Sequence, residues 1–131
     1  MTRPISDGME QTFALLAGLM ASASPADTLE PYRWEARPIL VFADPGDPRL
    51  DRQMAEFGAA REALRERRNV VVVDTNAASA LRERFGPRGF TVILVGLDGG
   101  EKARRGGVVP GDIFNDEIDA MPMRRRELER Q

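Results

Sequence analysis

The chain contains no cysteine and no histidine among its 131 residues. Without cysteine there is no thiolate nucleophile and no disulfide exchange, so thiol redox activity is excluded. Without histidine the most common general base and a usual zinc ligand are absent, and a Ser-His-Asp triad cannot be assembled. We therefore expect a protein that is not an enzyme and that carries no cofactor.

An excess of charge of one sign is also lacking. The 19 basic and 21 acidic residues give a formal net charge of −2, which provides no basis for a nucleic-acid partner. A hydrophobic content of 42% with 31% charged residues is that of an ordinary globular protein. At this length we expect one domain, stabilised by packing because no disulfide can form.

The N-terminal segment contains an apolar run, Thr12–Ala23, that is too short to span a bilayer as a mature helix. Small residues at 22–26 follow the signal-peptidase pattern, although Asp7 and Glu10 weaken the positive charge that precedes a signal sequence. We interpret residues 1–26 as a signal peptide, with an N-terminal helix as the alternative. The expected location is periplasmic or secreted, with no integral membrane segment in the mature chain, and the alternative location is cytoplasmic.

Two continuous apolar runs, Ile39–Ala43 and Val70–Val73, are typical of buried strands in a parallel sheet. Between them, apolar residues recur at three- and four-residue intervals, which predicts one helix with a single buried stripe. Asp47 is its expected N-cap, with Pro48 in the first helical position, and Asn69 ends it. These elements predict a right-handed β-α-β unit.

The second half predicts a helix, a strand, a charged edge strand and a closing helix, over Ala77–Phe85, Phe90–Val95, Glu101–Arg105 and Asp112–Ile118. A turn at Asp98–Gly100 joins the two strands, and Asp112 is the expected cap of the closing helix. Pro122 interrupts that helix before a charged helical tail. The order β-α-β-α-β-β-α predicts an α/β, thioredoxin-like fold with a central mixed sheet and flanking helices. A flavodoxin-like sheet would alternate strand and helix to the end.

The first predicted strand runs into Asp44–Pro48, the junction at which thioredoxin-like proteins carry their reactive cysteine. We therefore predict that residues 27–131 are a thioredoxin-like domain that lacks redox cysteines. Asp44 and Asp74 follow two parallel strands at the carboxyl edge of the sheet, where ligands of α/β proteins bind. They leave open a carboxylate- or metal-dependent enzyme, although Asp is also common at such positions because it starts turns and caps helices.

Five residues form the candidate partner-binding surface: Trp34, Arg37, Arg124, Arg125 and Arg126. Guanidinium groups bind carboxylate or phosphate groups in a bidentate manner. In the alternative interpretation the tryptophan belongs to the core, and the arginines pair with nearby acids, namely Asp119, Glu127 and Glu129. If the three consecutive arginines lie on the surface, replacing them with alanine lowers the melting temperature by no more than about 2–4 °C.

Three strings of the sequence occur in a characteristic order: Pro31–Pro38, Val95–Lys102 and Ile118–Arg125. Together they resemble a bacterial family known as domain of unknown function 4174. The resemblance covers roughly Leu29 to Glu129, nearly all of the expected mature chain. The closing string Ile-Asp-Ala-Met-Pro-Met-Arg is the most specific part, whereas the strand patterns alone are not specific.

The family is similar to a peroxiredoxin-like, thioredoxin-fold domain of animal extracellular matrix proteins of the sushi-repeat and coiled-coil-domain-containing kinds. Its bacterial members are typically short and follow signal peptides, so the resemblance implies export. No activity is established for it, and it implies no catalytic residue. We therefore expect a non-catalytic accessory module of the cell envelope that binds an unknown protein or envelope component. An intracellular scaffold is the alternative if the N-terminus is never cleaved.

Overall fold

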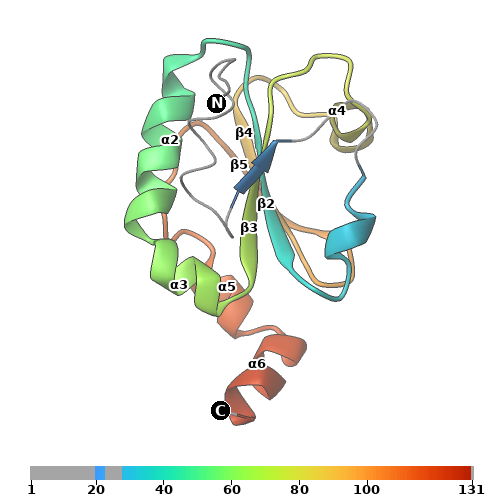
Figure 1. The fold of residues 1–131 in the computed structure, drawn as a ribbon, viewed down its shortest axis with the longest axis vertical. Coiled ribbons are helices and arrows are strands. Elements are labelled where there is room, and N and C mark those ends of the chain that lie inside the picture. Colours follow the sequence, from blue (N-terminus) through green and yellow to red (C-terminus); the bar gives the residue numbers. More distant parts are fainter. Residues whose placement is uncertain (1–19, 23–27, 131) are drawn as a thin grey trace, which may run out of the picture.

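The computed structural model describes residues 20–22 and 28–130. A mixed sheet with the strand order β1-β3-β2-β4-β5 lies at its centre (Figure 1). The strands are β1 (Met20–Ser22), β2 (Arg37–Phe42), β3 (Asn69–Asp74), β4 (Thr91–Val95) and β5 (Glu101–Gly106). β1 and β2 both run parallel to β3, whereas β4 is antiparallel to β2 and to β5.

Five helices and one short turn of 3₁₀ helix flank the sheet in the described residues. They are η2 (Glu30–Tyr32), α2 (Pro48–Ala59), α3 (Arg61–Glu66), α4 (Ala80–Phe85), α5 (Asn115–Asp119) and α6 (Pro122–Glu129). From β2 onward the predicted order of strands and helices is confirmed, with the first helix divided into α2 and α3. No helix in this part of the chain is long and apolar enough to cross a membrane.

Two apolar cores lie on opposite faces of the sheet, because neighbouring side chains of a strand point to opposite sides. Ile39 and Val41 of β2 belong to the core that includes residues of α2, α3 and α5, among them Phe57, Leu64 and Ile118. Leu40 and Phe42 belong to the other core, together with Leu29, Leu81 and Phe85. The helices therefore cover both faces, as Figure 1 shows for α2 and α4.

Several local predictions are confirmed. The Asp47 side chain accepts a hydrogen bond from the Arg49 backbone N–H at 2.9 Å, and Pro48 is the first residue of α2. At the β4–β5 turn, Asp98 Oδ1 accepts from the Gly100 backbone at 2.9 Å, and Gly99 has a φ of +87°. Glycine adopts that angle without the steric cost of a side chain. The charged edge strand is β5, in which Glu101, Lys102, Arg104 and Gly106 are exposed.

The prediction of one continuous helix after Pro48 is wrong, because the helix breaks at Ala60, with φ −101° and ψ 16°. The backbone of Gly111 packs against this point, so close that a Cβ atom there would collide with the Glu56 carbonyl and approach the Ala60 Cβ. The Gly111 N–H also donates to Glu56 Oε1 at 3.0 Å. A loop that is distant in sequence therefore fixes the end of α2.

The predicted cap at Asp112 is also wrong. The closing helix α5 begins at Asn115, its N-cap position is Phe114, and no side chain caps it. The loop before it is bound to α2 instead, since Gln53 exchanges two hydrogen bonds with the Val109 backbone, at 2.8 and 3.0 Å. Because this loop is anchored on α2, the chain makes a turn at 111–114 before it becomes helical.

The N-terminal prediction concerns residues that are mostly outside the described ones. Met20–Ser22 form strand β1 and pair with Val71–Val73 of β3, so these three residues do not belong to a helix. The rest of the expected signal peptide or N-terminal helix, at 1–19 and 23–26, lies outside the described residues.

Candidate functional site

The loop after β2 occupies the position at which thioredoxin-like proteins carry their reactive cysteine. Asp44 and Pro45 are exposed, and Asp47 is used as the cap of α2. Hydrogen bonds from the Arg49 side chain, with a further one from its backbone, lower the pKa of Asp47. The loop therefore starts a helix, and Asp44 is its one carboxylate that is exposed to solvent.

Asp44 and Asp74 do lie at the carboxyl ends of adjacent parallel strands, as the sequence predicts. Asp74 is only 1% exposed, however, and its oxygens accept hydrogen bonds from the Asn76 backbone at 2.9 Å and from Ser79 Oγ at 2.5 Å. Arg82 approaches it at 4.0 Å. Within residues 20–22 and 28–130, no three Asp, Glu, His or Cys side chains form a group that could hold a metal ion. Asp74 thus orders the turn into α4.

Of the four arginines predicted to bind a partner, two are buried and two are exposed. Arg37 and Arg124 are each 1% exposed, which corrects the expectation that they lie on the surface. Arg125 and Arg126 are exposed, as expected. The alternative interpretation holds for Arg124, because it pairs with Asp119 and Glu127, although not with Glu129. Buried charges require partners, and these two guanidinium groups have them in a shared network.

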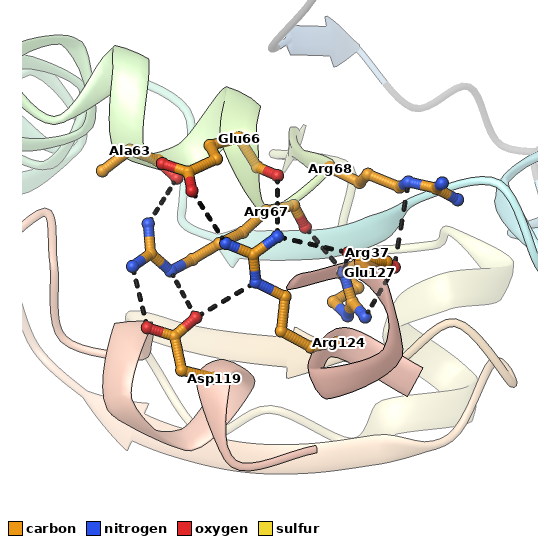
Figure 2. A network of polar contacts seen from close by, with 8 residues as sticks. All are labelled: Arg37, Ala63, Glu66, Arg67, Arg68, Asp119, Arg124 and Glu127. Atoms are coloured by element: carbon orange, nitrogen blue, oxygen red, sulfur yellow. Dashed lines mark hydrogen bonds and ion pairs between the residues drawn. The ribbon is translucent and has the colours of Figure 1, made fainter. Parts of the chain in front are cut away.

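Arg124 is the centre of this network (Figure 2). Its Nε donates to Asp119 Oδ1 at 3.1 Å, and its Nη2 donates to Glu66 Oε2 at 3.0 Å. Its Nη1 donates to Glu127 Oε1 at 3.3 Å and to the Glu66 carbonyl at 3.2 Å. One side chain of α6 therefore bonds to α3, to α5 and to its own helix.

Arg37 and Arg67 extend the network to β2 and to the end of α3. Arg37 Nη2 donates to Glu127 Oε2 at 3.1 Å, and its Nη1 donates to the Arg67 carbonyl at 2.9 Å. Arg67 makes a two-point contact with Asp119, at 2.9 and 3.0 Å. Residues of β2, of the end of α3, of α5 and of α6 thus meet in one cluster. Figure 2 shows Asp119 between Arg67 and Arg124, and Glu127 in contact with Arg37, Arg68 and Arg124.

Asp119 and Glu127, the two acids shared between arginines, both have a pKa below its usual value. Hydrogen bonds from Arg67, and then from Arg124, lower the pKa of Asp119 against the opposing effect of burial. For Glu127 burial is the largest single effect and opposes ionisation, but the contacts with Arg37, Arg124 and Arg68 outweigh it and lower its pKa. We therefore interpret this cluster as an ion-paired structural joint and not as a centre for acid–base chemistry.

Trp34 lies apart from this joint and outside both cores. It is 54% exposed and has a φ of +67°, an angle that is uncommon for a bulky residue. Its backbone N–H donates to the Leu97 carbonyl at 2.7 Å, and the Arg33 guanidinium lies 5.9 Å from its ring centroid. The prediction of a partner-binding role for Trp34, Arg125 and Arg126 stays a prediction, since nothing in the structure tests it.

Glu66 and Arg67 were not predicted from the sequence as members of the cluster. They lie at the end of a charged helical stretch in which acids and arginines alternate, and nothing local distinguishes them from solvent-exposed ion pairs. The fold pairs Glu66 with the buried Arg124, 58 positions away, and Arg67 with Asp119, 52 positions away.

The fold and this site define a thioredoxin-like α/β domain without cysteine. Spinach chloroplast thioredoxin f in its short form has a TM-score of 0.61 and 14% identity, over 80% of this chain and 95% of that one. A mutant thioredoxin from Halobacterium salinarum has a TM-score of 0.63 and 16% identity, over 79% and 90% of the two chains. An uncharacterised thioredoxin-like protein from Clostridium perfringens has a TM-score of 0.63 and 10% identity, over 87% and 90%.

The family is shown by the sequence itself. Residues 28–127 match the domain of unknown function DUF4174, and the chain belongs to this family. No curated protein matches the chain. The expected family and the expected thioredoxin-like fold are therefore both confirmed.

Proposed function

We propose that this protein is a non-catalytic thioredoxin-like binding module whose partner surface is centred on Trp34. The proposal is supported by the lack of cysteine together with one observation, the exposure of a large aromatic side chain at a left-handed backbone position. Exposed Trp and Arg side chains are the residues that most often anchor protein interfaces. Arg33, which is also exposed and lies over the ring, adds a cation to this surface.

The backbone at Trp34 supports a role other than folding. A left-handed conformation costs an L-residue roughly 1–2 kcal/mol, and glycine avoids this cost. The side chain is more than half exposed, so its burial contributes little to the stability of the fold. Steric strain of this kind is often retained at functional sites. A metal-dependent enzyme built on Asp44 and Asp74 is the other candidate, and no observation among the described residues favours it.

Trp34→Gly is expected to abolish partner binding and to leave the free energy of unfolding within about 1 kcal/mol of the wild type. The reason is that the substitution removes the exposed ring but keeps the backbone hydrogen bond to Leu97. The measurement is capture of partners from the envelope fraction of the native cells, combined with urea denaturation.

The matched control is Leu128→Ala, because Leu128 is the other large apolar side chain that is exposed in the described residues, at 40%. It should leave capture unchanged. If both variants capture the same proteins as the wild type, Trp34 does not contact the partner and this proposal is wrong.

We also propose that the protein is exported, which rests on the N-terminal sequence. The intact mass of the protein from fractionated native cells should then show a periplasmic species without residues 1–26. Such cleavage would remove β1, whose Met20–Ser22 pair with β3. A full-length cytosolic species would contradict export, and the protein would then be an intracellular scaffold with β1 as part of its sheet.

A further inference from the structure

A pocket of about 250 Å³ lies between the β4–β5 hairpin and the start of α6. Its walls include Arg37, Leu97, Lys102, Met121, Pro122 and Met123. These residues come from the three separate strings that resemble the family, Pro31–Pro38, Val95–Lys102 and Ile118–Arg125, which the fold brings together here. The pocket is separate from Trp34 and from the Asp44 loop, neither of which lines it.

One side of the pocket is apolar. Leu97 is buried, and Met121 and Met123 are half-buried on either side of the exposed Pro122. Thioether side chains are unbranched and polarizable, so they adapt to ligands of different shape. Since the methionines flank the first residue of α6, the end of α5 and the start of α6 hold them at the pocket.

The other side of the pocket is formed by a lysine lying over a glycine. The Lys102 stem passes so close to Gly96 that a Cβ atom at this glycine would collide with the Lys102 Cε. The Lys102 ammonium reaches Asp98 Oδ2 at 3.0 Å, and this pair is partly exposed. A cation on a flexible stem therefore lies at the apolar wall, held by one solvated carboxylate.

Arg37 lies at the pocket wall but offers a ligand no free donor. Its terminal nitrogens are bonded to Glu127 and to the Arg67 carbonyl, and its Nε is fully buried, without a hydrogen-bond partner among the described residues. The donor that a ligand can reach is therefore the Lys102 ammonium, which carries three N–H groups and bonds to Asp98 through one of them.

These features define the chemistry of a ligand. The pocket wall carries two cations, Arg37 and Lys102, and one acid, Asp98, beside an apolar surface. The charge of Arg37 is neutralised by Glu127, which belongs to the ion-pair network around Arg124. The charges that face the pocket are therefore those of Lys102 and of its partner Asp98. We propose that this pocket binds a small carboxylate with an apolar tail, its oxygens accepting from Lys102 Nζ and its tail lying between Met121 and Met123.

The test uses three probes of equal chain length on the full-length protein: octanoate, octanol and octylamine. The methionine methyl groups are labelled with ¹³C and followed by NMR. Octanoate should shift the signals of Met121 and Met123 and leave that of Met54, which lies in the core on α2, unchanged. Octanol should bind more weakly, and octylamine should not bind, because only the carboxylate carries a negative charge that pairs with Lys102.

Two substitutions examine the role of Lys102. Lys102→Met keeps the length of the side chain, removes its charge and should weaken octanoate binding about tenfold, the scale of one charge-assisted hydrogen bond. Asp98→Asn frees the lysine and should tighten binding. The control Arg105→Met removes a cation with an ion pair from the same strand outside the pocket, where Arg105 contacts Glu117 at 3.2 Å, and should change nothing.

Three results would overturn the proposal. If none of the probes shifts the two methionine signals, the pocket does not bind such ligands. If octanol binds as well as octanoate, the pocket is filled by apolar contact alone and recognises no carboxylate. If Lys102→Met and Arg105→Met weaken octanoate equally, the effect is one of overall charge and not of this site.

Discussion

Arg124→Ala is expected to lower the free energy of unfolding by about 3–5 kcal/mol, the range measured when one partner of a buried ion pair is removed. The substitution removes the guanidinium that bonds to Glu66, Asp119 and Glu127. Glu127 is only 9% exposed, so its carboxylate would keep Arg37 but lose its second cation inside the protein. Since a domain of this kind has a total stability of roughly 5–15 kcal/mol, the loss is large. Urea denaturation followed by circular dichroism measures it.

Arg125→Ala is the matched control, because it changes the same residue type one position along the same helix. Arg125 is exposed, so its loss should change stability by less than about 0.5 kcal/mol. Equal effects of the two substitutions would contradict the buried network. From the sequence all three arginines were expected to be available to a partner, and the structure instead buries the first of them.

Gly111→Ala is expected to destabilise the protein by about 3 kcal/mol, the upper part of the range for overpacking. Its new Cβ would collide with the Glu56 carbonyl, which is backbone of α2 and cannot move as a flexible side chain can. Relief of the collision would move the 109–111 loop, which is bonded to Gln53 and Glu56. The shift in the urea midpoint between the variant and the wild type measures the cost.

Gly58→Ala provides a control of opposite sign on α2, the helix against which Gly111 packs. Nothing lies within 4 Å of a Cβ atom at Gly58, and alanine is favoured over glycine inside a helix by roughly 0.5–1 kcal/mol. The variant should therefore be slightly more stable than the wild type. If Gly111→Ala were neutral, the close approach between the loop and α2 would not exist in solution.

The order of the elements could be predicted because the signals for it are local. Continuous apolar runs mark β2 and β3, the Asp47–Pro48 pair marks the start of α2, and Asp98–Gly100 marks the hairpin. The break at Ala60 was not predicted, since the backbone that packs against it is that of Gly111, in a loop distant in sequence. The misplaced cap at Asp112 has a related cause, the anchoring of the preceding loop on α2.

The site was predicted less well, because burial of a charged residue depends on partners that the fold supplies. Arg37 and Arg125 look equally suited to a surface, yet Arg37 is buried beside Glu127, 90 positions away. Asp119 and Glu127 were recognised as partners for the tail because they are close in sequence. The role of Glu66 follows only from the position of α6 against the end of α3.

The last helix has a consequence for how the chain folds. α6 is eight residues long, and Arg124 is its only buried residue. A helix of this length is not stable alone in water, so α6 forms only when it docks. Its docking residue shares Glu127 with Arg37, the first residue of β2. Formation of α6 and pairing of the buried Arg37 of β2 with Glu127 therefore occur together. A chain shortened before Glu127 would lose both the helix and the partner of Arg37.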